Sequence, residues 1–333
     1  MKIVKFSKKN TDIISIKKNF FLSNKKNLKE RLRINKLYIK QPKRKFCKNC
    51  NIKLGKPIFK SFGVNYTICK RCHHLNGFHI ETKKFLNNLY AQAKGKNYYR
   101  NYSSQFNQRV KNIYIPKVNF LKQVIKKKFN LLDVGSGAGH FLKACEIKNI
   151  KAIGLEPSKL MTSIAKSKLI KNKIINISLD EIHLKISSSN ENVLSLIGVL
   201  EHLEEPNRLL KSFKDSKIKY LYLSLPLFSL SSLIENSFSK VFPRHLSGAH
   251  THLYTYDSIV YFVKKFNLQI VGEWWFGSDF LDLYRSLLNS KNRDTKIFKQ
   301  ILDKYFLKNI DSFQSILDKK KISSEVHLIL KKQ

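Results

Sequence analysis

The sequence predicts an α/β fold, and two of its features carry that prediction. From about residue 130 onward, short apolar stretches alternate with helical segments, which is typical of a parallel sheet covered by helices. A glycine-rich turn at 135–139 follows the first apolar stretch and precedes a helical one. A third feature, two Cys-x-x-Cys pairs at 47–50 and 69–72, predicts a small zinc-binding module in front of the sheet.

The length and composition fit one large domain with a small module. Of the 333 residues, 42% are hydrophobic and 12% are aromatic, which is enough to bury a sizeable core and argues against disorder in the bulk of the chain. The longest uncharged apolar run, 220–234, contains Pro226 and is shorter than the roughly 20 residues that a membrane span needs. We therefore expect a soluble, cytoplasmic protein with no membrane span and no signal peptide.

The chain is strongly basic, with 64 Lys and Arg residues against 23 Asp and Glu residues and a formal net charge of +41. Such a charge is typical of proteins that bind nucleic acid or anionic membranes. Only 10 of the 64 are arginine, the residue favoured for bidentate phosphate recognition. Lysine, asparagine and isoleucine are abundant and glycine and proline are scarce, which favours A/T-rich coding as the main cause. Residues 1–44 are expected to form a basic, solvated extension, with a phosphate-binding arm as the alternative.

Four of the five cysteines predict a zinc ribbon over residues 45–80. They form two Cys-x-x-Cys pairs separated by 18 residues, and in a cytosolic chain this spacing indicates a metal site rather than disulfides. The two pairs direct four thiolates at one ion and complete a closed tetrahedral shell, so the site is expected to be structural. The segment 62–68 alternates as a short strand does. The predicted ligands are Cys47, Cys50, Cys69 and Cys72.

Three further residues carry side chains that bind metals or act as nucleophiles. His73 and His74 follow Cys72 directly and are alternative ligands, although four cysteines already satisfy one ion. Cys145 lies alone in an apolar helical segment, so we expect it to pack in the core rather than to act as a nucleophile.

The glycine turn connects a strand to a helix. The apolar strand 130–134 contains Asp133, and the helix is predicted over 139–147. Glycine removes the Cβ where a ligand approaches the backbone, and a helix N-terminus favours a carboxylate or a phosphate. The turn alone is weak evidence, because dinucleotide-binding folds use a similar pattern.

Three more strands follow, and each ends at polar residues. The strand 151–155 ends in Glu156, where a carboxylate can accept hydrogen bonds from both hydroxyls of a ribose. The strand 174–179 leads to Asp180, and the strand 192–197 leads to Gly198-Val-Leu-Glu-His202.

These residues resemble the motifs of the class I S-adenosylmethionine-dependent methyltransferases. The strand with Asp133 before the turn looks like their first motif, Glu156 looks like their ribose-binding acid, and 199–206 looks like the Leu-Glu-His segment of their O- and C-methylating branch. The resemblance implies the cofactor S-adenosylmethionine, with its methionine end at Asp133 and the turn, and its adenine edge at Ser178–Leu179 or Asp180. The implied cofactor-binding residues are Asp133, Gly135, Ser136, Gly137, Gly139, Glu156, Ser178, Leu179, Asp180 and Leu200.

The resemblance runs from about Asn107 to the C-terminus and implies a Rossmann-like sheet of seven strands with helices on both faces. The later elements expected from it are a strand at 220–226, a helix at 255–266, a strand at 268–275 and a final antiparallel strand at 324–330. The chain is therefore divided into a basic extension (1–44), a zinc ribbon (45–80), a helical linker or lid (81–129) and a methyltransferase domain (130–333).

Methyl transfer requires an acceptor aligned with the sulfonium and, for a hydroxyl or carbon acid, a base that removes a proton. Candidate bases should follow the fourth and fifth strands, at the edge where open α/β folds bind ligands. Histidine suits this task because its pKa lies near neutral pH. The predicted catalytic residues are His202, after the fourth strand, and His250 and His252, after the fifth. Arg244, in the same loop as the last two, is a candidate partner for a substrate phosphate or carboxylate.

A zinc ribbon ahead of such a domain is similar to the zinc-ribbon methyltransferases of sugar, cell-envelope and secondary-metabolite pathways. The tyrosine-rich segment 90–102 resembles the linker that those enzymes use near the substrate pocket. The resemblance therefore predicts O- or C-methylation of a small molecule, a nucleotide sugar or a glycan.

Two alternatives stay open. The ribosomal-RNA guanine methyltransferases also carry an N-terminal zinc module, and the basic charge favours an RNA substrate. Nitrogen-methylating enzymes often have an Asn/Asp-Pro-Pro-aromatic turn after the fourth strand, where this chain has Gly198–His202, so nucleic acid is not favoured. The second alternative is a non-enzymatic nucleic-acid-binding module on a methyltransferase fold, against which the intact glycine turn and Glu156 argue.

Overall fold

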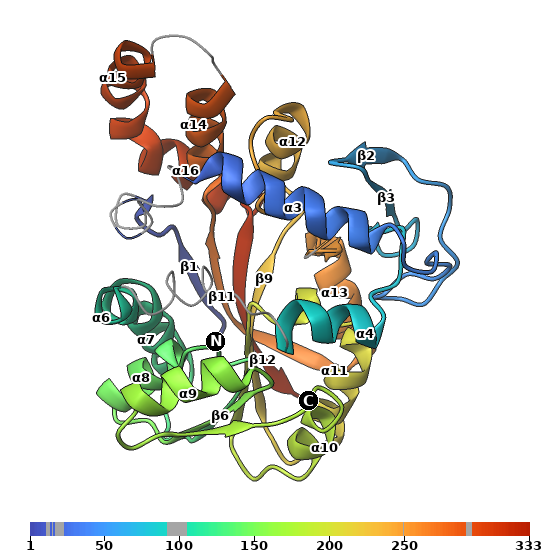
Figure 1. Ribbon diagram of the computed structural model, residues 1–333. Coiled ribbons are helices and arrows are strands. Elements are labelled where there is room, and N and C mark those ends of the chain that lie inside the picture. The colour runs from blue at the N-terminus through green and yellow to red at the C-terminus, as the bar shows by residue number, and fades with distance from the viewer. Residues whose placement is uncertain (11–13, 15, 17–22, 92–104, 249, 291–294) are drawn as a thin grey trace.

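The computed structural model describes residues 1–10, 14, 16, 23–91, 105–248, 250–290 and 295–333, and an eight-stranded sheet forms its centre (Figure 1). Within these residues β12 runs antiparallel to both of its neighbours, and the other paired strands of the sheet are parallel. In order across the sheet, the strands are β1 (Ile3–Phe6), β11 (Leu268–Phe276), β12 (Glu325–Lys332), β9 (Tyr220–Pro226), β8 (Val193–Ile197), β5 (Leu131–Val134), β6 (Ala152–Glu156) and β7 (Lys173–Asn176).

Helices cover both faces of the sheet, which explains why its central strands are apolar almost throughout. On β9, Leu221, Leu223 and Leu225 pack toward one face, whereas Tyr222 packs toward the other. The first face is covered by α10 (Ile182–Ser187), α11 (Pro206–Asp215) and α13 (Tyr256–Lys265). The second is covered by α7 (Ile115–Val124), α8 (His140–Ile147) and α9 (Lys159–Lys168).

Local sequence signals start several of these helices. The Ser158 side chain accepts a hydrogen bond from the backbone of Met161 and caps α9. Thr255 and Ser258 form a reciprocal capping box at the start of α13, and Pro206 occupies the first turn of α11. Serine and threonine side chains accept hydrogen bonds from the free N–H groups of a helix N-terminus, and proline has no N–H group to satisfy there.

The sheet has eight strands, so the expected count of seven was wrong by one. The extra strand is β1, which pairs in parallel with β11 and supplies partners to backbone groups that would otherwise form a free sheet edge. The indole N–H of Trp274 also donates to the carbonyl of Ser7, at 3.0 Å. The alternation of β1 is hidden in the sequence because its partly buried positions include Lys5, whose amine lies 4.0 Å from the centre of the Trp274 ring.

The predicted extension, 1–44, is not a solvated tail in its described part. Besides β1 it contains α3 (Asn24–Tyr38), which crosses the molecule from the loop after α12 to the second sheet (Figure 1). Tyr38 is fully buried, and its hydroxyl donates to the carbonyl of His79 at 2.6 Å. The Asn35 side chain accepts from the backbone N–H of Gly248 and donates to the carbonyl of Phe62. These buried groups sit on a helix whose other residues are mostly charged, so the composition alone did not reveal its packing.

The cysteine-rich segment forms a second sheet that does not end at residue 80. Its strand β4 pairs with β10, which comes from the loop ahead of α13. In order, the strands are β10 (His252–Leu253), β4 (Leu75–Gly77), β3 (Val64–Ile68) and β2 (Phe59–Ser61). The core beneath this sheet also includes residues of α3 and Leu246, so the small module and the large domain share one apolar core.

The described part of the segment 81–129 is mostly helical. Residues 92–104, and with them most of the tyrosine-rich stretch, lie outside the described residues. The last helix, α7, packs against the central sheet through Val118 and Phe120 and so belongs to the large domain. The elements ahead of it are α4 (Lys83–Leu86), η1 (Asn87–Ala91), α6 (Phe106–Arg109) and η2 (Val110–Tyr114).

The connection from β11 to β12 carries a helical insertion that no sequence motif predicted. The insertion consists of α14 (Asp279–Ser290), α15 (Thr295–Tyr305), η4 (Leu307–Asn309) and α16 (Ile310–Lys319). It is tied to α12 (Leu230–Ser237) because Asp279 accepts hydrogen bonds from Ser229 and Ser231. Among the described helices, none has the length and apolar character needed to cross a membrane.

Candidate functional site

The glycine turn lies at the carboxyl edge of the sheet, between β5 and α8, and its three glycines have different surroundings. All have positive φ, +71° at Gly135, +53° at Gly137 and +81° at Gly139. A Cβ at Gly135 would lie 2.6 Å from Val199, and one at Gly139 would lie 2.9 Å from Ala165. A Cβ at Gly137 would meet no atom within 4 Å. The first and third glycines therefore permit close packing, and the middle one borders open space.

Glu156 ends β6 next to this turn. Its carboxylate accepts hydrogen bonds from the backbone N–H groups of Gly137, at 2.8 Å, and Ser158, at 2.9 Å. Burial raises the pKa of Glu156, and these two hydrogen bonds act in the opposite direction. The carboxylate is thus held at the open side of the turn by groups that favour its charged form.

Asp133 is buried inside the strand that enters the turn. Its carboxylate accepts from the hydroxyl of Ser195 on β8 at 2.6 Å, and burial raises the pKa of Asp133 to about 7. Ser136 donates its hydroxyl to the Asp133 carbonyl at 2.8 Å, so its side chain braces the turn. Ser195 was missed at the level of sequence because a serine inside an apolar strand gives no motif.

The other residues expected at the cofactor have different settings. The Ser178 hydroxyl and backbone N–H both donate to Glu181. Leu179 is partly buried against the cores of both sheets. Asp180 is exposed and forms an ion pair with Lys83 of α4 at 2.8 Å. The Leu200 side chain is fully buried in the core of the large domain, which leaves its backbone as the part available to a ligand.

The profile of a family described as a methyltransferase domain matches residues 106–273. The chain belongs to this methyltransferase family. The match begins at α6, ends within β11, and includes the glycine turn and Glu156. The protein is accordingly a class I, S-adenosylmethionine-dependent methyltransferase with an α/β Rossmann-like fold. A search of curated proteins finds none that matches it.

Solved methyltransferases resemble the chain at low identity. An S-adenosylmethionine-dependent methyltransferase from Archaeoglobus fulgidus is 19% identical with a TM-score of 0.46, and the alignment covers 71% of this chain and 100% of the other. The magnesium protoporphyrin IX methyltransferase of Synechocystis PCC 6803 is 11% identical with a TM-score of 0.49, covering 76% and 100%. A protein from Thermotoga maritima described as a possible histamine N-methyltransferase is 16% identical with a TM-score of 0.40, covering 71% and 97%.

The methyltransferase has a group of titratable side chains beyond the end of β8. Glu201 and His202 lie on the short helix η3 (Leu200–His202), and His250 lies on the loop that follows α12. The rings of His202 and His250 have centroids 4.7 Å apart. Burial raises the pKa of Glu201 to about 8 and lowers the pKa of His250 well below its ordinary value. Two of the three predicted catalytic histidines are therefore adjacent.

The structure does not bring His252 into this group. It lies on β10, is fully buried, and one of its ring nitrogens is 2.8 Å from a ring nitrogen of His74. Burial lowers the pKa of both rings, that of His74 to about 3. Arg244, the candidate partner for a substrate phosphate or carboxylate, instead forms an ion pair with the buried Asp282 at 2.8 Å. Neither pairing has a local sequence signal, since each joins segments far apart in the chain.

Two charged residues near the group were not predicted from the sequence. Lys117 is only 7% exposed on α7, and burial lowers its pKa while nearby carboxylates of Glu325, Glu201 and Asp133 act on its charge. Glu325, the first residue of β12, accepts from the Ser224 hydroxyl and the His327 ring, both at 3.1 Å. They have no signal in the sequence, because α7 and β12 are far from β8 and β9 along the chain and reach the carboxyl edge of these strands only in the folded protein.

The four cysteines of the second sheet converge. All are buried, the sulfurs of Cys47 and Cys72 lie 3.7 Å apart, and those of Cys50 and Cys69 lie 3.3 Å apart. All four sulfurs lie within 4.8 Å of one another. Four thiolates about 2.3 Å from one zinc ion lie about 3.8 Å apart. The residues present therefore fit a tetrahedral zinc site.

The loop inside the first cysteine pair contacts the segment that carries His202. Lys48 is buried, forms an ion pair with Glu81 at 2.8 Å, and donates to the carbonyl of Leu203 at 2.5 Å. The Asn207 side chain donates to the carbonyl of Lys48 at 2.7 Å. Direct hydrogen bonds thus join the loop between Cys47 and Cys50 to the segment that directly follows His202.

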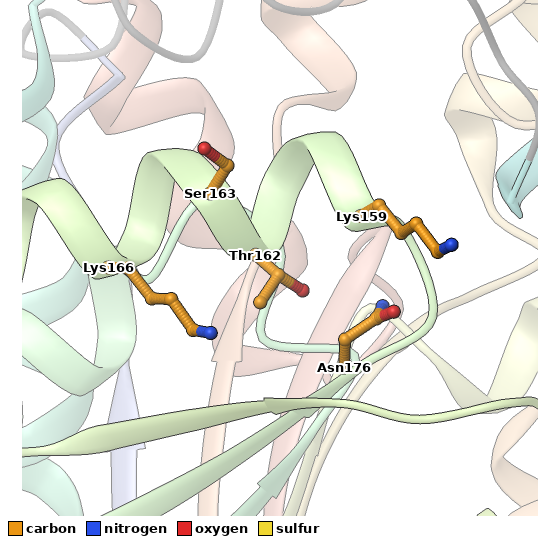
Figure 2. A pocket seen from close by; sticks show the side chains of 5 residues that line it. All are labelled: Lys159, Thr162, Ser163, Lys166 and Asn176. Carbon is orange, nitrogen blue, oxygen red and sulfur yellow. The ribbon is translucent and has the colours of Figure 1, made fainter.

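A surface hollow lies between α9 and the end of β7 (Figure 2). It is lined by Lys159, Thr162, Ser163, Lys166 and Asn176, and none of the predicted site residues is among them. The Thr162 hydroxyl donates to the carbonyl of Ser158, and the Asn176 amide donates to that of Glu156. These side chains brace the turn that carries Glu156, and the hollow itself is not the predicted cofactor site.

Proposed function

We propose that this methyltransferase methylates an oxygen or carbon atom of a small molecule, a nucleotide sugar or a glycan. The observation that carries the proposal is the pairing of His202 and His250 beyond β8, on the edge where the glycine turn also lies. Ligands of open α/β folds bind at this carboxyl edge. A proton acceptor placed there supports transfer to a hydroxyl or a carbon acid, since both must lose a proton.

The cofactor residues form the first part of the proposal. Asp133 and the turn of Gly135, Ser136, Gly137 and Gly139 hold the methionine end, and Glu156 binds the two ribose hydroxyls. Ser178–Leu179 or Asp180 borders the adenine, with the Leu200 backbone beside it. The open space at Gly137 and the adjacent Glu156 carboxylate support this arrangement.

When bound, the cofactor supplies an electrophilic methyl group on a sulfonium. The chain must bind and orient the acceptor in line with it and remove the acceptor proton. His202 and His250 line the acceptor side and one of them takes that proton, while the buried Lys117 and the partly exposed Glu325 contribute charges next to them. Alignment of the reacting atoms can lower the barrier by about 7–11 kcal/mol.

We expect Glu156→Ala to weaken S-adenosylmethionine binding at least tenfold. The substitution removes hydrogen bonds to the ribose hydroxyls, each of which contributes about 1.5–3 kcal/mol when charge-assisted. Calorimetric titration of the cofactor measures the change. Glu205→Ala, at an exposed carboxylate before α11, is the matched control and should bind normally. Equal affinity in the two variants would remove Glu156 from the cofactor site.

We expect His202→Ala and His250→Ala to keep cofactor affinity and to lose turnover. Removal of a general base typically costs about 10²–10⁴-fold in rate. His252→Ala should instead lower the free energy of unfolding, because His252 is buried against His74. Turnover per folded molecule and thermal stability are measured on each variant. Full turnover in both of the first two variants would contradict a catalytic role for the pair.

A structural zinc ion is the second part of the proposal. Cys47, Cys50, Cys69 and Cys72 bind it, and the converging sulfurs support this assignment. We retain the division into an N-terminal extension (1–44), zinc ribbon (45–80), helical linker or lid (81–129) and methyltransferase domain (130–333) as a description of sequence modules. The shared core means that these modules fold together.

The acceptor class is tested by methyl transfer from labelled cofactor into fractionated cell extract. Label in small molecules or glycans supports the proposal. An RNA acceptor is the second candidate, favoured by the net charge of +41, and label recovered only in RNA would establish it instead. Absence of transfer to any fraction, with normal cofactor binding, would favour a binding module on a methyltransferase fold.

A further inference from the structure

The group beyond β8 has the composition of a metal site. One potential ligand atom from each of Glu201, His202 and His250 lies within 4.8 Å of the other two. A carboxylate oxygen of Glu201 lies 3.9 Å from Nε2 of His202. Two ligands of one cation at about 2.1 Å are at most about 4.2 Å apart, so small side-chain shifts suffice to bring the set onto one ion.

Two atoms of this group are buried without a hydrogen-bond partner among the described residues. They are Oε2 of Glu201, on a side chain only 5% exposed, and Nδ1 of His250. Leaving a buried acceptor unpaired costs about 1–3 kcal/mol, and more when it is charged. The charge of Lys117 acts on Glu201 and lowers its pKa, but no ion pair joins the two side chains in the described part of the chain. The geometry therefore leaves a buried carboxylate oxygen available for another partner.

A second His/carboxylate group in the chain provides a contrast. Glu235, His245 and Asp282 are also close together, but their carboxylates are already satisfied. Glu235 accepts from the backbone N–H groups of residues 244–246, and Asp282 is paired with Arg244 and Arg285. That group stabilises the loop after α12. The group beyond β8 has no comparable set of partners for Glu201 within the described residues.

We propose that Glu201, His202 and His250 bind a divalent cation and that the acceptor substrate completes its coordination through an oxygen. Two imidazoles and one carboxylate leave open positions for a substrate, as in catalytic zinc and iron sites. The four cysteines form a closed thiolate shell, so the two sites have different roles. The inference about the acceptor rests on the proposed function, whereas cation binding itself does not.

The cation changes how the acceptor proton is lost. A hydroxyl on a divalent ion has a lowered pKa, so it releases its proton to solvent. Its oxygen then forms the new O–C bond as the S–C bond of the sulfonium breaks and the electron pair stays on sulfur. The histidines then act as metal ligands, and the acceptor class narrows from oxygen or carbon to oxygen.

Titration with Mn²⁺, followed by calorimetry or electron paramagnetic resonance, tests the proposal on the zinc-loaded full chain. Manganese is the suitable probe because it prefers carboxylate and imidazole donors, whereas soft thiolates retain zinc. We expect one Mn²⁺ per chain. Affinity should fall about tenfold or more in Glu201→Gln and in His250→Ala. Substitution of a residue that only hydrogen-bonds to a metal ligand already lowers metal affinity about 10–100-fold. His183→Ala, at a histidine that contacts Arg208 on the surface, should bind Mn²⁺ normally.

Glu201→Gln keeps the size of the side chain, so its folding is expected to be normal, and thermal unfolding of each variant checks this. Absence of Mn²⁺ binding to the wild type, or equal affinity in all three variants, would overturn the cation site. S-adenosylmethionine is titrated into the same samples. A wild-type protein that binds the cofactor but not Mn²⁺ would reject only the cation site and leave the histidine base in place. A wild-type protein that binds neither Mn²⁺ nor S-adenosylmethionine would reject the proposed function as well.

Discussion

Gly137→Val should weaken the binding of S-adenosylmethionine about 100-fold or more and reduce methyl transfer with it. Gly137 has φ of +53°, a conformation that β-branched residues adopt at a cost of about 1–3 kcal/mol. Its Cβ position opens onto space in which no protein atom lies within 4 Å, and the proposed cofactor occupies that space. The strain lowers the stability of the fold, whereas steric exclusion of the cofactor should cost more than about 3 kcal/mol of binding free energy, on the order of 100-fold in affinity.

The chain offers a matched control for this substitution. Gly63 also has positive φ, +86°, and open space at its Cβ position, but it lies in the turn between β2 and β3. Gly63→Val should therefore carry a similar backbone cost and retain cofactor affinity. Calorimetry on both variants, with their thermal unfolding, separates the two effects. Normal cofactor binding by folded Gly137→Val would contradict the placement of the cofactor at this turn.

The parts of the fold that the sequence predicted best are those in which a specific residue type is required at a specific position, such as glycine in the turn and cysteine at the metal site. The strand, glycine turn and helix at 131–147 were predictable because closely spaced glycines between an apolar strand and a helix are typical of a turn that binds a ligand through its backbone. The convergence of the four cysteines was predictable because the two residues of each pair are only three positions apart in the chain. The seven strands of the central sheet other than β1 were expected from the resemblance to a family, and that family is the one to which the chain belongs.

The remaining elements depend on contacts between distant segments. In the strand β1 a lysine, Lys5, occupies a partly buried position against Trp274, so the alternation that normally marks a strand is absent from its sequence. The insertion of α14 to α16 lies between β11 and β12 without a motif, and its position is fixed by hydrogen bonds to Asp279. Composition suggested a free basic tail for the same reason, since the buried residues of α3 are few and spaced along a highly charged helix.

The same limit applies to the acceptor side. His202, His250 and His252 were grouped because two strand-end loops should meet at one edge, and the structure brings together the first two. His252 instead pairs with His74, a contact that requires knowledge of the β4–β10 pairing. Lys117 and Glu325 gave no signal because a lone lysine or glutamate in a lysine-rich chain is not distinctive until its burial is known.

Zinc ligation and the acceptor side are connected by the fold, so loss of zinc should affect both. The sequence alone predicted a separate small zinc ribbon ahead of the large domain. However, β4 of the ribbon pairs with β10, and Lys48 within the first cysteine pair donates to the Leu203 carbonyl next to His202. A disturbance of the ribbon therefore reaches the loop that carries His250 and the helix that carries His202.

Cys69→Ser is expected to lose the zinc ion and to expose the backbone amides of residues 45–80 to hydrogen exchange. Structural zinc contributes apparent binding free energies of about 10–16 kcal/mol to small metal modules, far more than the ribbon's short strands can replace. Because of the shared core, we expect faster exchange also at 245–254 and a loss of turnover. Strands β5 and β6 should exchange at the wild-type rate, since their hydrogen bonds lie within the central sheet.

Cys145→Ser is the matched control, because Cys145 is a buried cysteine of α8 outside the zinc ligands. It should keep one zinc per chain and normal exchange in the ribbon, whatever its effect on overall stability. Elemental analysis and hydrogen-exchange mass spectrometry are measured on both variants. Retained zinc in Cys69→Ser would contradict the proposed ligand set. Loss of zinc with unchanged exchange at 245–254 would instead show that the ribbon and the acceptor loop are energetically independent despite the β4–β10 pairing.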